Sequence, residues 1–336
     1  MNDFFALTDE QRRLIINQTA TTIGIPAEAV EKDLWVTIVL QIVFKLPYSD
    51  KLVFKGGTSL SKVWNKIERF SEDIDLAIDR SLFDCSGDLT IKQIKTLRKK
   101  SSLFVKDKMC LDLASAIDKN GLSKWCVVEP EPDGDGDKTY PEPRKLFVKY
   151  KSLYKVPIDY LKPVVMLEIG SRSLIEPFEC YRVNSLIEQK LKFNTTISDV
   201  KIPTAVPEKT FIEKIFLLHE LFSVESTADV DRKSRHLYDL ERMMECDFAN
   251  SAICNDVLWN TVQHHREIFT HIKGVDYSSD IRDRINLIPQ NYMIQAWRSD
   301  YIKMQNSMIY GDSMPFEQLL DRMRELQERV RNHSRF

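Results

Sequence analysis

Several features that would assign a protein to a specialised class are missing from this chain of 336 residues. Its longest apolar stretch, Leu34 to Phe44, is interrupted by Thr37 and Gln41. It is far shorter than the roughly 20 residues that a membrane-spanning helix needs. The N-terminal segment lacks the basic start and apolar run of a secretory signal peptide. We therefore expect a soluble protein of the cytoplasm.

Cysteine pattern and net charge exclude further classes. None of the six cysteines forms a CxxC pair, so six reduced thiols are the simplest interpretation. The 48 lysines and arginines are balanced by 50 aspartates and glutamates, which gives a formal net charge of −2. A surface that binds nucleic acid would therefore have to be a local basic patch, for which the basic residues of 92–108 and 144–155 are candidates.

Apolar spacing predicts an α+β protein with two domains. In the first 205 residues short strands alternate with helices: strands are expected over 51–54, 73–78, 125–128, 146–150 and 164–169, and helices over 8–24, 27–46, 58–67 and 91–116. Beyond this point the pattern is helical, over 209–223, 232–245, 255–272, 290–307 and 316–333. We therefore expect a small mixed sheet flanked by helices (1–205), followed by a helical domain (206–336), whose last helix docks on the body of the protein.

The segment from Phe54 to Leu76 combines two features that suit phosphate chemistry. First, Gly56 and Gly57, followed by Thr58 and Ser59 at the start of a helix, offer backbone N–H groups and hydroxyls to an anion. Second, Asp73 and Asp75 are two positions apart on a predicted strand and therefore share one face, whereas Ile74 points to the core.

Two like charges on one face repel each other, and a hard divalent cation relieves the repulsion. A bare Asp-x-Asp pair is more often an exposed strand face, and two glycines alone are more often an ordinary turn. Their combination in one short segment favours a site for a metal ion and a phosphate.

Glu168 is the candidate for a third carboxylate. It lies in an otherwise apolar strand, Val-Val-Met-Leu-Glu-Ile-Gly, where an inward-facing carboxylate needs a partner or a metal ion. A residue of an edge strand that faces water is an equally good interpretation. If Glu168 joins Asp73 and Asp75, the three acids would suit a two-metal centre.

These residues together resemble a known family. Lys55-Gly-Gly-Thr-Ser-Leu-Ser-Lys62 with Arg69-Phe-Ser-Glu-Asp-Ile-Asp-Leu76 resembles the AbiEii/AbiGii toxins, which belong to the DNA polymerase β-type nucleotidyltransferase superfamily. Glu31-Lys-Asp33 followed by Trp35, the segment Thr210 to Glu220, and Arg235-His-Leu-Tyr-Asp-Leu240 resemble further motifs of the same family. The likeness covers about residues 27–245, and the 15 residues between Gly57 and Asp73 resemble this toxin branch rather than polymerases.

The resemblance implies roles for the matching residues of the first half. Ser59 and the Gly56–Gly57 backbone would hold the triphosphate with assistance from Lys62. Asp73 and Asp75 would bind Mg²⁺ or Mn²⁺.

For Lys214 and Asp239, in the second half, the resemblance and the local pattern disagree. The resemblance implies that Lys214 reaches the triphosphate or base, and that Asp239 positions Lys214 or acts as a base near the acceptor. By pattern alone Lys214 would be a snorkelling surface lysine and Asp239 an acid on a helix surface. The histidines at 219 and 236 are better explained by packing and hydrogen bonding than as metal ligands.

Three functional hypotheses follow. The resemblance implies a nucleotidyltransferase toxin of a type IV toxin–antitoxin or phage abortive-infection system, which transfers NMP from an NTP to an RNA or protein acceptor. The 3′ end of tRNA is then the leading acceptor, and the antitoxin is expected to form no stable complex with the toxin. The second hypothesis is a nucleotide-binding module without turnover, and the third is an interaction protein whose Asp-x-Asp pair has no function.

Overall fold

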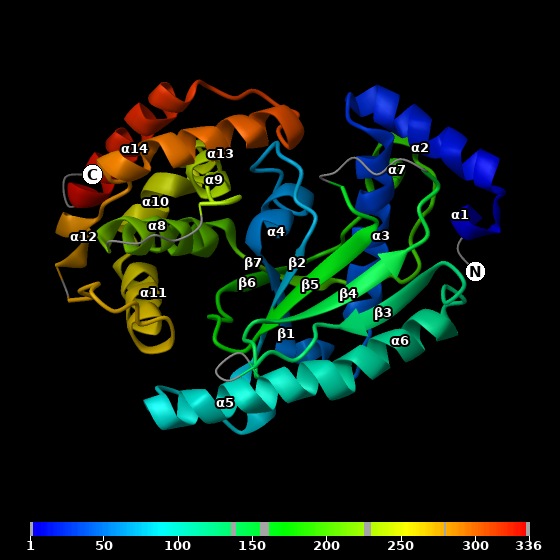
Figure 1. Ribbon diagram of the computed structural model, residues 1–336, viewed down its shortest axis with the longest axis horizontal. Helices are drawn as coiled ribbons and strands as arrows, with labels where there is room; N and C mark the ends of the chain where they lie inside the picture. Colours follow the sequence, from blue (N-terminus) through cyan, green and yellow to red (C-terminus); the bar gives the residue numbers. More distant parts are fainter. Residues whose placement is uncertain (1–2, 136–138, 155–160, 225–229, 279, 334–336) are drawn as a thin grey trace. The chain divides into compact units, whose positions relative to one another are not determined.

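The computed structural model describes residues 3–135, 139–154, 161–224, 230–278 and 280–333 (Figure 1). The chain divides into two compact units: residues 1–63 with 70–205, and residues 64–69 with 206–336. The second unit therefore includes a short segment from the first part of the chain, which the sequence pattern does not reveal. The α+β class with a mixed sheet is confirmed.

A seven-stranded sheet forms the centre of the first unit. Its strands are β1 (Leu52–Lys55), β2 (Ile74–Ile78), β3 (Cys126–Pro130), β4 (Arg144–Tyr150), β5 (Val164–Gly170), β6 (Phe178–Tyr181) and β7 (Ile202–Ala205). They lie in the order β3-β4-β5-β2-β1-β7-β6. The β1–β7 and β2–β5 pairs are parallel, and the other pairs are antiparallel.

Side chains alternate across the central strands, as the period of two requires. Ile74 and Leu76 of β2 and Leu167 and Ile169 of β5 are fully buried. The residues between them on the opposite face are partly exposed, among them Asp75. One face of the sheet therefore builds the core, and charged residues occupy part of the other.

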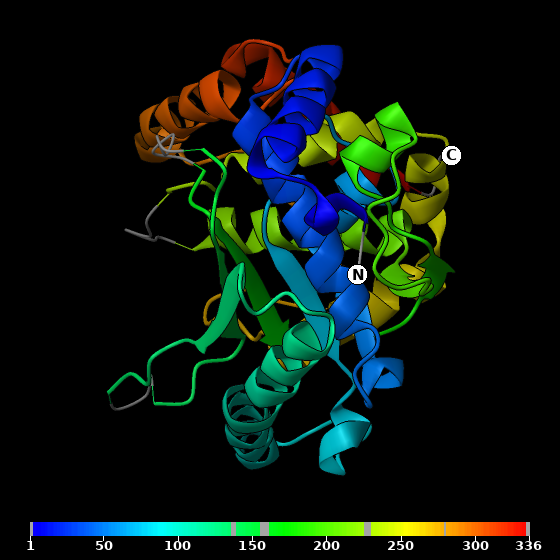
Figure 2. The ribbon, with the colours of Figure 1, turned by 90° about the vertical axis from the view of Figure 1, so that its right-hand side faces the viewer.

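Seven helices complete the described part of the first unit: α1 (Asp3–Ala6), α2 (Asp9–Ile23), α3 (Ala27–Val43), α4 (Gly56–Lys62), α5 (Ile91–Leu103), α6 (Cys110–Lys119) and α7 (Leu186–Leu191). A capping box of Thr8 and Gln11 starts α2. α2 packs against α3 (Figure 2), and α3 packs against both β5 and α6. Every residue of α3 from Ala29 to Val43 is buried, so this helix is the core of the unit.

Two helices differ from the sequence prediction. The helix expected over 91–116 is interrupted by a π-helical stretch, Phe104–Met109, between α5 and α6. The helix expected over 58–67 starts at Gly56 and ends at Lys62, and the next residues leave it with Asn65 at a positive φ of 49°. Apolar spacing continues past this end because Ile67 is buried in the second unit instead.

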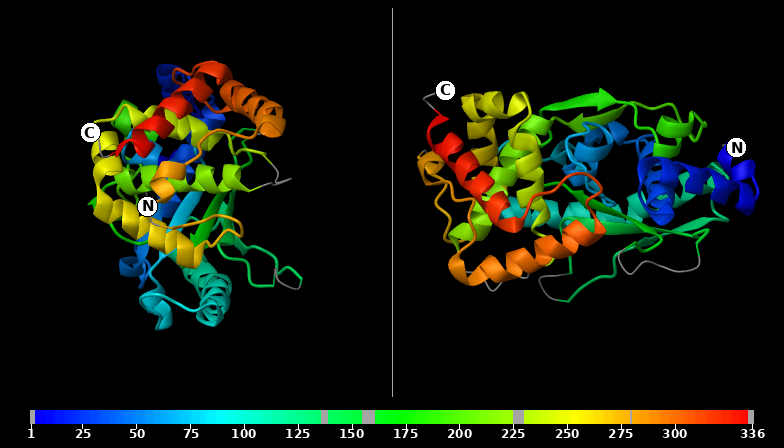
Figure 3. Two further views of the ribbon diagram at one scale, coloured as in Figure 1. Left: turned by 90° about the vertical axis from the view of Figure 1, so that its left-hand side faces the viewer. Right: turned by 90° about the horizontal axis from the view of Figure 1, so that it is seen from above.

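The second unit is helical. Its helices are α8 (Pro207–Ser223), α9 (Arg235–Met244), α10 (Phe248–Cys254), α11 (Asp256–Phe269), α12 (Ile281–Arg284), α13 (Ile294–Ser307) and α14 (Phe316–Arg331). Short 3₁₀ turns occur at Ser49–Lys51 and Arg80–Phe83 in the first unit and at Asn291–Met293 in the second. α14 packs on α9 (Figure 3) and on α12, as expected for a helix that docks on the body. Among the described residues, each helix is too short or too polar to cross a lipid bilayer.

Candidate active site

The glycine turn lies directly beside Asp75. β1 runs into α4 through Gly56, and β1 pairs with β2 so that Lys55 lies opposite Asp75. Gly56 has a φ of +80°, and a Cβ atom placed on it would lie 1.9 Å from Oδ2 of Asp75. Only glycine fits here, because the backbone is left-handed and the carboxylate packs against its Cα. The Asp75 carboxylate therefore faces the glycine turn.

Hydroxyl groups of α4 hold this turn in place. Oγ1 of Thr58 lies 2.5 Å from the carbonyl oxygen of Asp73 and 2.8 Å from Oγ of Ser71. Because a carbonyl can only accept, Thr58 donates its proton to Asp73, and Ser71 donates to Thr58. The Ser59 hydroxyl donates to the carbonyl of Gly56 at 2.8 Å. Thr58 and Ser59 are both buried: the Thr58 hydroxyl binds the segment on which Asp73 lies, and the Ser59 hydroxyl binds the first residue of α4.

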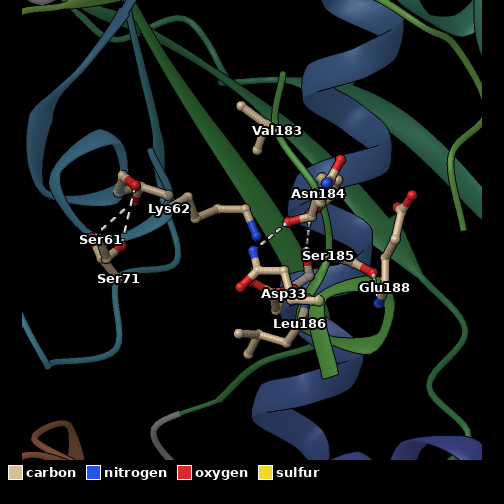
Figure 4. A network of polar contacts seen from close by, with 12 residues as sticks. Asp33, Ser61, Lys62, Ser71, Val183, Asn184, Ser185, Leu186 and Glu188 are labelled. Atoms are coloured by element: carbon tan, nitrogen blue, oxygen red, sulfur yellow. Dashed lines mark hydrogen bonds and ion pairs between the residues drawn. The ribbon is translucent and has the colours of Figure 1, made fainter. Parts of the chain in front are cut away.

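Lys62, the predicted assistant at the triphosphate, has a buried partner. Its ammonium group forms an ion pair with Oδ1 of Asp33 from α3, and Oδ2 of Asp33 accepts a hydrogen bond from the backbone N–H of Leu186 at 2.7 Å (Figure 4). Both side chains are less than a tenth exposed. In this structure Lys62 therefore ties α4 to α3 and to the start of α7.

The register of the sheet places Glu168 next to Asp75. Asp75 pairs with Glu168 across β2 and β5, and Glu168 pairs with Lys145 across β5 and β4. The Lys145 ammonium lies 3.1 Å from Oε1 of Glu168. Since Lys55 lies opposite Asp75, four charged residues form one row across four strands. The interpretation of Glu168 as an edge-strand residue is wrong, because β5 lies between β2 and β4.

The acidic residues fit a metal ion only in part. Among the described residues, no three side chains of His, Cys, Asp or Glu are gathered closely enough to hold one. Glu168 pairs with Lys145. Asp73 and Asp75 flank the buried Ile74, and both are partly exposed. Mg²⁺ is commonly held by one or two carboxylates together with phosphate oxygens. The donor set of Asp73 and Asp75 beside a glycine turn fits that mode of binding.

A second polar cluster lies inside the helical unit. Asp239 of α9 is fully buried and accepts two hydrogen bonds from Arg69, at 2.6 and 2.8 Å. The Lys214 ammonium of α8 lies 2.9 Å from the Oδ2 atom of Asp239 and 3.2 Å from Nδ1 of His236. The interpretation of Lys214 and Asp239 as surface residues is therefore wrong.

Burial and neighbouring charges shift the pKa values of the three titratable groups Asp239, Lys214 and His236. Burial alone would raise the pKa of Asp239, but the charges of Arg69 and Lys214 outweigh it and hold the pKa well below its usual range. Burial lowers the pKa of Lys214, and the charge of Asp239 opposes this effect. Burial and the charge of Lys214 also hold the pKa of His236 well below its usual value, so the imidazole is neutral. Since an ammonium only donates, Nδ1 of His236 accepts.

A comparison with known families decides the assignment. The family model described as nucleotidyl transferase AbiEii toxin, type IV toxin–antitoxin system, matches residues 39–322. This chain belongs to the AbiEii family. It is accordingly a nucleotidyltransferase of a toxin family that uses NTP. The match reaches well beyond residue 245, so it includes C-terminal helices in which the sequence shows no motif.

Two further comparisons complete the picture of this AbiEii protein. No curated protein matches its sequence. Among solved structures it is similar to MenT4, a nucleotidyltransferase toxin from Mycobacterium tuberculosis, with a TM-score of 0.47 and 16% identity. That similarity covers 97% of this chain and 100% of the other.

Sequence reasoning misses the roles of two residues of this AbiEii protein, each of which pairs with a candidate site residue within its own unit. Arg69 stands in the sequence only as part of a motif, and its partner Asp239 is 170 positions away. Asp33 likewise belongs to a motif without an expected role, and its partner Lys62 is 29 positions away. The signal that could find both is the same: a charge inside an apolar segment needs a partner of opposite charge.

Proposed function

We propose that this AbiEii toxin transfers a nucleoside monophosphate from an NTP to a hydroxyl group of RNA, with the 3′ end of tRNA as the leading acceptor, and that it uses Mg²⁺ or Mn²⁺. One observation carries the proposal. The Asp75 carboxylate packs against the Cα of Gly56, at the first residue of a helix whose first turn has no acidic side chain. A metal-binding carboxylate and a backbone that can approach phosphate are thus adjacent.

The reaction is a substitution at the α-phosphorus. The acceptor oxygen forms a bond to this atom, the bond from the α-phosphorus to the oxygen that bridges to the β-phosphate breaks, and pyrophosphate leaves. The hydroxyl proton is lost to solvent or to a nearby base. A bound divalent ion would neutralise phosphate charge and lower the pKa of the attacking hydroxyl. Positioning and charge neutralisation are most of what such a transfer requires.

In the first unit, Asp73 and Asp75 are the proposed metal ligands. The N–H groups of Gly56 and Gly57 are the proposed triphosphate donors, because the hydroxyls of Thr58 and Ser59 already hold the turn. This assigns the two hydroxyls to shaping the loop. Lys62 would act at a distance, since its ion pair with a buried aspartate fixes the position of α4.

Glu168 is proposed to serve as an adjustable third carboxylate. Its ion pair with Lys145 is only partly buried, and such pairs contribute little to stability. The negative charge beside Asp75 is therefore available to a metal ion at small cost. In the second unit, Lys214 is proposed to contact the triphosphate or base. Asp239 would position it, a role that suits its 2.9 Å ion pair and its depressed pKa better than that of a base.

The biological setting follows from the family. We propose that the protein acts in the cytoplasm, where NTP and tRNA are found. Its antitoxin would oppose the effect of the toxin without forming a stable complex with it.

The test is incubation of the protein with each α-labelled NTP, Mg²⁺ and total tRNA, followed by separation of RNA from protein. We expect label on RNA with the wild type and its loss in Asp75→Asn. A matched control is Asp79→Asn. Asp79 follows the same strand, caps a 3₁₀ turn and pairs with Lys51. Equal labelling by the wild type and Asp75→Asn would contradict the proposed role of Asp75.

One alternative function remains as a proposal, a nucleotide-binding module without turnover. It is favoured by the ion pairs of Lys62 with Asp33 and of Glu168 with Lys145, because these pairs occupy two of the proposed catalytic side chains of the first unit. Saturable, metal-dependent NTP binding with no label transferred to RNA or to the protein would support it over the enzyme.

A further inference from the structure

A pocket of about 580 Å³ opens in the first unit beside the N-terminal helices. We call it the N-terminal pocket. It is lined by α1 and the start of α2, by the residues that precede β3, and by those that follow β4. Its floor and walls include Phe5, Arg12, Trp125 and Leu153. None of the residues implicated in the proposed reaction contributes to it.

The wall formed by residues 152 and 153 is fixed from behind. Oε1 of Glu31 accepts a hydrogen bond from the N–H of Leu153 at 2.8 Å, and Oε2 accepts from the Ser152 hydroxyl at 2.5 Å. Arg13 donates to the carbonyl oxygen of Leu153 at 3.1 Å. This wall of the pocket is therefore held in place by hydrogen bonds to α2 and α3.

Positive charge dominates the lining. Arg12, Lys124 and Lys151 line the pocket together with one acid, Asp9, whereas the whole chain carries a formal net charge of −2. Asp9 already pairs with Arg12 at 2.5 Å. Nε of Arg12 is buried, and it has no hydrogen-bond partner among the described residues. The pocket therefore offers cationic side chains to an anion.

An aromatic ring accompanies these cations. The Trp125 ring is tilted against Phe5 at 4.8 Å between centroids, and the Arg12 guanidinium lies 5.6 Å from the Trp125 centroid. The Lys124 ammonium lies 3.9 Å from the same ring. Lys124 is exposed, so a flat ligand can take its place on the ring while the ammonium meets a phosphate. Aromatic rings interleaved with cations are the pattern that binds single-stranded nucleic acid.

The distance from the charged row suits a polymeric ligand better than a free nucleotide. Lys145 of the row and Lys151 of the pocket are six positions apart along β4 and its extension. At the rise of a β-strand this separates them by about 20 Å. A mononucleotide cannot extend over this distance, whereas a strand of RNA whose end reaches the row can.

We propose that the N-terminal pocket binds a nucleotide of the single-stranded acceptor RNA, with its base on Trp125 and its phosphates near Lys124 and Lys151. This inference rests on the proposed function for the identity of the acceptor. It adds a binding site remote from the reacting atoms, which holds the RNA while its end is modified.

The test measures binding of a fluorescein-labelled single-stranded oligoribonucleotide to the full chain by anisotropy at several salt concentrations. Trp125→Ala is expected to weaken binding about 5- to 150-fold, the range of one lost base–aromatic stack. Trp125→Phe restores most of the affinity if stacking is the cause. Lys124→Ala and Lys151→Ala should each flatten the slope of log K against log salt concentration by about 0.7.

The matched control is Lys201→Ala. Lys201 is exposed and directly precedes β7, on the other side of the sheet centre from β3. Its loss should leave both the affinity and the salt slope close to those of the wild type. Circular dichroism of each variant shows whether the fold is retained, and Trp125→Phe keeps the proposal testable if Trp125→Ala does not fold.

Several outcomes would overturn the inference. One is unchanged RNA affinity in Trp125→Ala. A second is competition by an acidic peptide as effective as that by RNA of equal charge, which would indicate a general anion or protein site. A third is AMP binding as tight as the oligonucleotide and equally dependent on Trp125.

Failure of the proposed reaction gives a different result from failure of RNA binding in the N-terminal pocket. If Asp75→Asn and the wild type transfer no label but bind RNA with the same dependence on Trp125, only the proposed reaction fails. If label is transferred and Trp125→Ala does not raise the KM for RNA, only the N-terminal pocket fails.

Discussion

Replacing Gly56 by alanine tests the contact on which the proposed site depends. The substitution has two separate costs: the left-handed backbone, with φ at +80°, and the overlap of the new Cβ with Oδ2 of Asp75 at 1.9 Å. Gly24 has the same φ of +80°, but a Cβ atom added there would meet no other atom within 4 Å. Gly24→Ala therefore carries the backbone cost alone, about 1–2 kcal/mol.

The contact itself can be isolated by a double-mutant cycle. Gly56→Ala should destabilise the protein by more than Gly24→Ala does, because the Asp75 carboxylate has to move or the turn has to shift. In the Asp75→Ala background the overlapping carboxylate atoms are absent. The cost of Gly56→Ala should then fall toward that of Gly24→Ala, with only the Cβ of residue 75, at 3.0 Å, still close to the new methyl group. A coupling free energy of about 1–3 kcal/mol is expected for groups in direct contact.

Urea denaturation of the four variants and the wild type measures these free energies, and label transfer to tRNA measures function. Gly24→Ala should retain transfer, whereas Gly56→Ala should lose it even where the protein remains folded. Equal costs of Gly56→Ala in the presence and absence of the Asp75 carboxylate would show that this side chain does not lie against the turn.

Three further predictions follow from the buried and half-buried charges. Asp239→Asn leaves Arg69 without its buried counter-ion and should lower the free energy of unfolding by about 3–5 kcal/mol in urea. Because the pKa of Asp239 is depressed, its contribution is present above the ordinary carboxyl value of 3.8 and is lost as pH falls below it, a loss that Asp239→Asn should not show. Burial lowers the pKa of His219 to about 4, so the unfolded chain takes up a proton at higher pH than the folded protein does. The free energy of unfolding should therefore fall by up to about 3 kcal/mol between pH 6.5 and 4. His219→Gln should remove this pH dependence. Lys145→Met should change the free energy of unfolding by less than about 1 kcal/mol. It should raise the affinity for Mn²⁺ about three- to tenfold in a calorimetric titration, because Glu168 loses its pairing cation. Unchanged affinity would exclude Glu168 from the metal site.

Local features of the site could be predicted from the sequence because they depend on near neighbours. Gly56 and Asp75 belong to one short segment. Because β1 and β2 flank α4 and pair with each other, their register brings the two residues together. The strand around Asp75 was predictable from its alternating pattern. The length of α4 was not, since Ile67 continues the helical spacing although it is buried elsewhere.

Long-range pairing could not be read from a single sequence. Whether Glu168 lies beside Asp75 depends on strand order and register, which one sequence leaves open, because a shift of one residue would turn the carboxylate to the other face. The burial of Lys214 depends on Asp239 and Arg69, which are distant in the chain. A lysine on an apolar helix has the same pattern whether it snorkels or pairs with a buried acid.

The most direct test of the proposed site is a crystal structure with Mn²⁺ and an NTP analogue that cannot be cleaved at the α–β bond. Anomalous scattering locates the metal independently of the protein atoms. We predict a manganese peak in contact with Asp75 and with triphosphate oxygens, and the triphosphate over the Gly56–Gly57 turn. A nucleotide and metal bound elsewhere, with Asp75 in contact with neither, would contradict the proposed site.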